Sequence, residues 1–137
     1  MPPEKEPARI LVVDDDKHLA DNLAEYLAKL GYRVVAAYGG PDALDRFRDG
    51  DFHLVVTDFM MPDIDGISLL ERMKGINREV IVILITGYGT VDSAVRALKK
   101  GAHDFIQKPF KMEKLGKIIA RALAEQETNS THESGVE

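Results

Sequence analysis

Short continuous apolar runs alternate along this chain with segments in which apolar residues recur every three or four positions. The runs have the length of strands that are covered on both faces, and the periodic segments have the spacing of helices with one buried face. The predicted strands are residues 9–13, 33–37, 54–58, 80–86 and 103–107. The predicted helices are residues 17–30, 40–48, 66–75, 90–100 and 111–126.

This alternation of strands and helices predicts a single α/β domain. Strands that alternate with helices form a parallel sheet with helices on both faces. The domain is predicted to span residues 8–126. Residues 1–7, which are polar and contain three prolines, are predicted to be a disordered lead-in, and residues 127–137 a polar tail, either disordered or the start of a linker.

Composition narrows the class of protein. The chain of 137 residues carries a net charge of -5, which argues against a general nucleic-acid binder because that function needs a basic face. It has no cysteine, so disulfides and thiolate catalysis are excluded. No apolar stretch reaches the length of a membrane span, and the first residues lack the apolar core of a signal peptide. We therefore expect a cytoplasmic protein that does not contact a membrane.

Polar and charged residues end or directly follow four of the five predicted strands. In open parallel sheets the functional crevice lies beyond the carboxyl ends of the strands, so these side chains are predicted to gather at one edge. Each of them alone could be a turn or capping residue. Their recurrence at the same edge predicts a site instead. The residues are Asp14, Asp15, Asp16, Asp58, Thr86 and Lys108.

Converging carboxylates predict a bound cation, because they repel one another unless a positive charge neutralises them. A hard divalent cation with oxygen ligands fits, and Mg²⁺ is favoured because it needs few protein ligands and keeps several waters. A phosphoryl group entering such a site would meet the cation, the Lys108 ammonium and the Thr86 hydroxyl. A central carboxylate could then act as a nucleophile and form an aspartyl phosphate.

Four segments, in this order and spacing, resemble the receiver domain of two-component response regulators: ILVVDDD, VVTDFMMPDIDG, ILITGYG and GAHDFIQKPF. The resemblance covers about residues 8–125. It implies a flavodoxin-like sheet of strand order 2-1-3-4-5 and a signalling switch that promotes its own phosphorylation, rather than a turnover enzyme. The sequence is most similar to receivers of the nitrogen-regulation type, which often precede an ATPase that activates sigma-54 transcription.

The resemblance assigns the acidic residues by position. Asp58 corresponds to the phosphoacceptor. Asp14 and Asp15 correspond to the acidic pair, in which Asp15 would touch Mg²⁺ directly and Asp14 through water. The backbone carbonyl of Met60 would be a further metal ligand.

The resemblance also assigns the switch residues. Thr86 corresponds to the switch hydroxyl and Phe105 to the aromatic switch position. Because Phe105 has no hydroxyl, its rotation could change packing but could not form a new hydrogen bond. Lys108 corresponds to the phosphate-binding lysine, and the Lys108–Pro109 bond to one that is usually cis in the family.

Three further acids lie near the matched positions without belonging to them. Asp16 is predicted to cap the first helix. Asp63 and Asp65 are interpreted as loop acids that precede Gly66.

Met60 and Tyr88 are predicted to flank the phosphate, since each lies two residues beyond a matched position. Bulky groups there could exclude attacking water, so we hypothesise that Asp58 phosphate hydrolyses slowly. The alternative is that both side chains merely cover their loops.

The resemblance implies that a sensor histidine kinase donates the phosphoryl group and that an output domain or a downstream protein responds to it. A second copy of the chain, in a phosphorylation-dependent homodimer, is a further possible partner. The predicted output face comprises the helix 90–100, the strand 103–107 and the helix 111–126. Its exposed basic residues would include Arg96, Lys99, Lys100 and His103. The alternative is an ordinary solvated helix face, in which basic residues near the C-terminus favour the helix dipole.

Two rival functions remain open at this point. A Mg²⁺-dependent phosphohydrolase of the haloacid-dehalogenase type also uses an aspartate nucleophile, but on its first strand in a pattern that DDDKH lacks. A receiver-like interaction module without phosphorylation is the other rival. The complete set of matched residues speaks against it.

Overall fold

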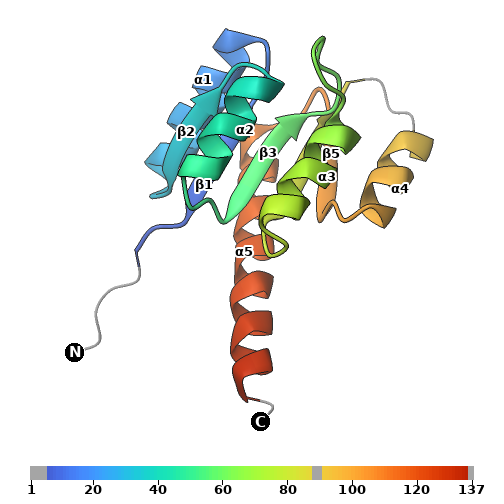
Figure 1. The fold of residues 1–137 in the computed structure, drawn as a ribbon. Coiled ribbons are helices and arrows are strands. Elements are labelled where there is room, and N and C mark those ends of the chain that lie inside the picture. The colour runs from blue at the N-terminus through green and yellow to red at the C-terminus, as the bar shows by residue number, and fades with distance from the viewer. Residues whose placement is uncertain (1–5, 88–90, 136–137) are drawn as a thin grey trace.

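A five-stranded parallel sheet lies between two layers of helices in the computed structural model, which describes residues 6–87 and 91–135 (Figure 1). The strands are β1 Arg9–Val13, β2 Arg33–Ala37, β3 Leu54–Asp58, β4 Ile81–Thr86 and β5 Asp104–Gln107. The helices are α1 Lys17–Lys29, α2 Gly40–Asp49, α3 Gly66–Ile76, α4 Val91–Lys99 and α5 Met112–Gly135. The predicted boundaries are confirmed to about one residue, except at the end of α5.

The strand order is β2-β1-β3-β4-β5, as the resemblance implied. Strand β3 is therefore the central strand, and the very apolar β4 lies between β3 and β5. Val13 at the end of β1 pairs with Thr57 of β3, and Asp58 pairs with Ile85 of β4. This register brings the residues that follow β1 to the same level as the end of β3.

Both faces of the sheet are buried, which explains why the strands are continuous apolar runs. Successive side chains of a strand point to opposite faces. Ile10 and Val12 of β1 pack in the layer of α1 and α5, whereas Leu11 and Val13 pack in the layer of α2, α3 and α4. All four side chains are fully buried. Figure 1 shows the two helical layers on either side of the sheet.

Helix α4 buries a narrower stripe than its sequence pattern predicts. The sequence spacing predicts that Val91, Ala94, Val95 and Leu98 share the inner face of this helix, but Val95 and Leu98 are 41% and 39% exposed. Ala94 is buried as predicted, and Ala97 is buried as well. The physical reason is that α4 covers the edge of the sheet, where β5 has no further neighbouring strand. The prediction of an inward Val95 and Leu98 is therefore wrong, and α4 presents both side chains at the surface.

Helix α5 extends beyond its predicted end at Gln126, to Gly135. Figure 1 shows that its C-terminal part runs past the sheet and projects away from the domain. Once a helix is anchored by packing, adding further residues is inexpensive because each fixes one residue for one new hydrogen bond. Residues 127–135 are thus helical rather than disordered, and the assignment of this segment as a linker stays a prediction. Neither α5 nor any other helix in the described part is sufficiently long and apolar to span a lipid bilayer.

Candidate functional site

Two aspartates at the carboxyl ends of neighbouring strands are almost completely buried. Asp14 directly follows β1, and its N–H still donates a hydrogen bond to the Ala37 carbonyl of β2 at 3.1 Å. Asp58 is the last residue of β3. Their residues are only 1% and 8% exposed. The backbone of the sheet therefore holds two carboxylates in buried positions, which apolar side chains usually occupy.

Asp14, Asp15 and Asp58 form an acidic cluster, in which one carboxylate oxygen of each lies within 4.8 Å of the others. Asp14 Oδ1 accepts a hydrogen bond from the Asp16 N–H at 2.9 Å. Asp14 Oδ2 is buried and has no hydrogen-bond partner among the described residues. Buried polar atoms are normally paired, and Mg²⁺ prefers carboxylate oxygens as ligands. The residues present therefore fit a Mg²⁺ ion.

Burial makes the acidic cluster unfavourable as a set of bare charges. It raises the pKa of Asp14 to about 6, and the neighbouring Asp58 carboxylate adds to this rise, while the Asp16 N–H opposes it. Burial likewise raises the pKa of Asp58, and the Lys108 ammonium opposes that rise. A cation bound among the carboxylates would favour their charged forms. The electrostatics of the cluster are therefore those of a cation site.

Lys108 brings a positive charge to the acidic cluster. Its Nζ atom lies 3.7 Å from Asp58 Oδ2 and 3.9 Å from Asp14 Oδ2. Its backbone N–H donates to the Thr86 carbonyl at 2.7 Å, which fixes the segment after β5 against the end of β4. The Lys108–Pro109 bond is cis, as the resemblance implied. Distances of this length leave the ammonium beside both carboxylates without a short hydrogen bond to either.

The two residues assigned as switch positions lie on adjacent strands. Thr86 ends β4 and is 4% exposed. Phe105 of β5 pairs with Leu84, two residues before Thr86, and is half-buried against the layer of α2, α3 and α4. Because residues two apart share a face of the sheet, Thr86 lies on the same face as Leu84. Tyr88, predicted to flank the phosphate, lies outside the described residues.

Met60 lies in the β3–α3 loop, residues 59–65, immediately beside Asp58. Its N–H donates to Asp58 Oδ1 at 3.3 Å, and it forms an isolated antiparallel bridge with Asp65. Its side chain is the most exposed of the large apolar residues described, with 70% of the residue accessible. The backbone of Met60 is thus adjacent to the acidic cluster, while its side chain extends into solvent.

The three acids outside the matched set all cap helices. Asp16 accepts from the Leu19 N–H at the start of α1, which confirms its predicted role. Asp65 was interpreted only as a loop acid, but it accepts from the Ser68 N–H at 2.8 Å and caps α3. An Asp directly before a helix is the expected cap, so the sequence did carry this signal.

The third acid, Asp63, was likewise interpreted as a loop residue. Its Oδ2 accepts from the Gly40 N–H of α2 at 3.1 Å. No sequence pattern connects these two positions, which are 23 residues apart.

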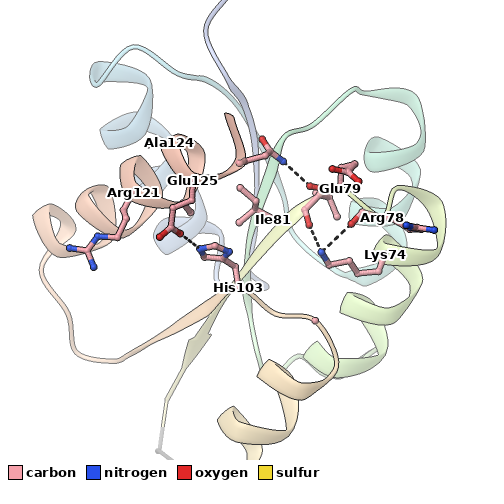
Figure 2. A pocket seen from close by; sticks show the side chains of 12 residues that line it. Lys74, Arg78, Glu79, Ile81, His103, Arg121, Ala124 and Glu125 are labelled. Carbon is pink, nitrogen blue, oxygen red and sulfur yellow. Dashed lines mark hydrogen bonds and ion pairs between the residues drawn. The ribbon is translucent and has the colours of Figure 1, made fainter. Parts of the chain in front are cut away.

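A cavity lies at the opposite end of the strands from the acidic cluster, beside the first residues of β4 and β5 (Figure 2). Lys74 Nζ donates to the Val80 and Arg78 carbonyls at 2.7 and 3.3 Å, and burial lowers its pKa. His103 Nε2 lies 3.0 Å from Glu125 Oε1, which ties the start of β5 to α5. These polar groups hold the α3–β4 loop, β5 and α5 together. We assign the cavity a structural role.

The family model of the response regulator receiver domain matches residues 10–120. Among curated proteins, the transcriptional regulatory protein ZraR of Salmonella typhimurium is 39% identical over 128 residues, which are 93% of this chain and 28% of that protein. The DNA-binding transcriptional regulator NtrC of Azospirillum brasilense is 37% identical over 117 residues, which are 85% of this chain and 24% of that protein. The chain thus spans about a quarter of the length of these relatives.

Solved structures agree with this match. NtrX from Brucella abortus has a TM-score of 0.89 and 34% identity, over 93% of this chain and 29% of that chain. A CheY-like receiver domain protein from Methanospirillum hungatei has a TM-score of 0.86 and 32% identity, over 90% of this chain and 98% of that chain. NtrC and NtrX among the relatives confirm the similarity to the nitrogen-regulation type.

Proposed function

This chain belongs to the response regulator receiver domain family, and we propose that it is a phosphorylation-dependent switch in which Asp58 accepts a phosphoryl group from a sensor histidine kinase. One observation carries the proposal. The Asp58 carboxylate ends the central strand within the acidic cluster, with the Lys108 ammonium 3.7 Å away. That arrangement combines a nucleophile, a cation site and a fixed positive charge.

The proposed phosphorylation needs no general base, because a carboxylate is already ionised. An oxygen of Asp58 forms the new bond to phosphorus, while the bond between phosphorus and the donor breaks and the donor keeps its electron pair. Lys108 stabilises the negative charge of the transferring group from a position that the chain holds beforehand. When bound, Mg²⁺ would neutralise further charge on that group. Asp14, Asp15, Asp58 and the Met60 carbonyl would hold it.

The signal would arise from the charge that the phosphoryl group adds. Such a group brings nearly two negative charges and three acceptor oxygens to the end of β3. Lys108 and the Thr86 hydroxyl are the donors assigned to it. Phe105 would respond through packing alone, because it packs against the layer of α2, α3 and α4 and has no hydroxyl. A local charge change would thereby bias a packing arrangement elsewhere in the domain.

We propose α4, β5 and α5 as the output surface. Val95 and Leu98 expose apolar surface on α4, and Arg96 and Lys99 are also exposed. Lys100 lies 3.3 Å from Glu71 of α3, so part of the predicted basic set pairs within the domain. The partner at this surface would be an output domain, a downstream protein or a second copy of the chain. Control of transcription is proposed because the curated relatives are transcriptional regulators.

Intact mass spectrometry after incubation with Mg²⁺ and acetyl phosphate tests the proposed chemistry. The expected result is one phosphoryl adduct that requires Mg²⁺ and is absent from Asp58→Asn. Asp16→Asn is the matched control, because it removes one nearby carboxylate while asparagine remains a good helix cap. If acetyl phosphate gives no adduct, a histidine kinase donor is used next.

Failure with both donors would favour the second candidate function, a receiver-like interaction module that is not phosphorylated. The phosphohydrolase alternative has lost support, because the chain belongs to the receiver family and its candidate nucleophile ends β3 rather than β1.

A further inference from the structure

Helix α2 lacks a capping side chain of its own. Its N-cap residue is Gly39, which makes no side-chain hydrogen bond. The Asp63 carboxylate from the β3–α3 loop takes over this role, since Asp63 Oδ2 accepts from the Gly40 N–H at 3.1 Å. A carboxylate at a helix N-terminus satisfies a free donor and interacts favourably with the helix dipole. The cap of α2 thus comes from another part of the chain.

The same loop packs closely over the start of α2. A Cβ atom added to Gly40 would clash with Ile64 Cγ2, at a separation that real Cβ contacts do not reach. Gly40 is buried, and Ile64 packs against the core layer of α2, α3 and α4. The absence of a side chain at Gly40 is therefore what lets the loop approach the helix. Asp63 and Ile64 together hold the loop against α2.

The β3–α3 loop is also the segment that presents Met60 to the acidic cluster. It is short, since it contains only residues 59–65 between Asp58 and α3. Its first part is bonded to Asp58 through the Met60 N–H, and its last part caps α3 through Asp65. Asp63 is the contact that ties the middle of the loop to α2. A loop held at three points has little freedom to move the Met60 carbonyl.

We propose that Asp63 is a positioning residue for the Mg²⁺ site: by capping α2 it fixes the β3–α3 loop, and with it the Met60 backbone, in the geometry that binds the ion. This inference rests on the proposed function, because it concerns the same cation site. It makes the start of α2 energetically coupled to the acidic cluster. Mg²⁺ binding should then favour the Asp63–Gly40 contact, and the contact should favour Mg²⁺ binding to the same extent.

Titration of the folded protein with Mg²⁺, followed by the amide NMR signals of Met60 and Gly40, tests the coupling. Asp63→Ala is expected to weaken Mg²⁺ binding about fivefold, the low end of coupling between linked sites. Asp63→Asn keeps an acceptor oxygen and should lie between wild type and Asp63→Ala. In the wild type the Gly40 signal should shift with the same Kd as the Met60 signal.

The double variant Gly39→Asn/Asp63→Ala separates positioning from helix stability. Gly39 has extended backbone that any residue can adopt, and the nearest atom to an added Cβ is Asp63 Oδ2, which Asp63→Ala removes. The asparagine introduced by Gly39→Asn would cap α2 from within its own chain segment but would not hold the loop. We expect this variant to recover the thermal stability lost in Asp63→Ala while its Mg²⁺ affinity stays reduced.

Two results would overturn the inference: unchanged Mg²⁺ affinity in Asp63→Ala, or recovery of affinity together with stability in the double variant. The first would show that the contact is uncoupled from the site, and the second that only the stability of α2 matters. Failure of the proposed function looks different. In that case the wild type itself would bind no Mg²⁺ and acquire no adduct on Asp58, and the inference would fall with it.

Discussion

The Lys108 ammonium lies 3.9 Å from Asp14 Oδ2, the buried carboxylate oxygen that has no hydrogen-bond partner among the described residues. At this distance the ammonium offsets charge but does not supply the missing hydrogen bond. Asp14 is therefore the least satisfied charged group of the acidic cluster. Both the response to Mg²⁺ and the response to pH should depend on it.

Mg²⁺ should stabilise the folded protein, because the acidic cluster exists only in the folded chain. Binding at a free concentration of about 100 times the Kd would add about 2.7 kcal/mol to the free energy of unfolding. Thermal unfolding with and without MgCl₂ measures this effect. Asp14→Asn should lose most of the stabilisation, whereas the exposed Asp51→Asn at the other end of β3 should keep it. An equal response in both variants would place the bound ion elsewhere.

Without metal, Asp14 should make the protein less stable as the pH rises. Burial raises the pKa of Asp14 from 3.8 to about 6, so the folded state binds more protons than the unfolded state between these values. Stability should fall across this range by an amount on the order of 2–3 kcal/mol at most. The measurement is urea unfolding in EDTA from about pH 4 to about pH 7, for wild type and Asp14→Asn. The free energy of unfolding of Asp14→Asn should increase relative to that of the wild type as the pH rises. A difference that stays constant with pH would contradict the prediction.

Lys108→Met should slow phosphorylation of Asp58 without removing Mg²⁺ binding. The ammonium is the fixed positive charge beside the acceptor, and loss of one such group commonly reduces the rate by a factor of about 100 or more. Removing a cation from the acidic cluster leaves Mg²⁺ binding unchanged or tighter. The rate of adduct formation with acetyl phosphate measures the first effect, and the Mg²⁺-induced thermal shift measures the second. The exposed Lys111→Met is the matched control, and an equal loss of rate in this control would argue for a general charge effect.

Met60 and Tyr88 should lengthen the lifetime of the Asp58 phosphate. The Met60 side chain stands in solvent beside the acceptor, where it could obstruct attacking water. After the donor is removed, the Asp58 phosphate should therefore decay several-fold faster in Met60→Asn/Tyr88→Glu than in the wild type. Ile76→Asn, which changes an exposed apolar residue away from the site, is the control. Equal lifetimes in all three proteins would dismiss the hypothesis.

Two glycines should respond in opposite ways to alanine. Gly40→Ala would drive a Cβ into Ile64 Cγ2, and such overpacking commonly costs about 1–3 kcal/mol. Gly75 of α3 has no atom within 4 Å of an added Cβ, so Gly75→Ala should stabilise the protein by up to about 1 kcal/mol. Urea unfolding measures both changes. If Gly40→Ala is as stable as the wild type, the close contact between α2 and the β3–α3 loop is not rigid.

The order of strands and helices could be predicted from the sequence because it depends on local patterns. Apolar runs and helical periodicity identified each element, and Gly31 and Gly101 follow helices closely in the structure. The end of α5 could not be found this way, because the residues after Gln126 are polar and mostly weak helix formers. Helical propagation from the packed part of α5 decided that segment.

The sequence also placed Asp14, Asp58, Thr86 and Lys108 at strand ends, and parallel strands bring such ends to one edge. The roles proposed for them rest on residue type and order together with the resemblance to receiver domains. What the sequence did not contain were the contacts between elements that lie far apart along the chain. The exposure of Val95 follows from the position of α4 at the sheet edge, which depends on strand order.

The Asp63–Gly40 hydrogen bond shows most clearly the difference between local sequence patterns and contacts between distant segments. Asp65, directly before α3, can be predicted as a cap from the sequence, because its partner Ser68 lies only three residues away. Asp63 caps a helix that begins 23 residues earlier, and nothing in the local pattern around either residue points to the other. By itself, then, the sequence determined which residues carry charge and hydrogen bonds and which elements hold them. Only the packing of α2 against the β3–α3 loop decided which of them meet, because such contacts arise when separate segments close around a common core.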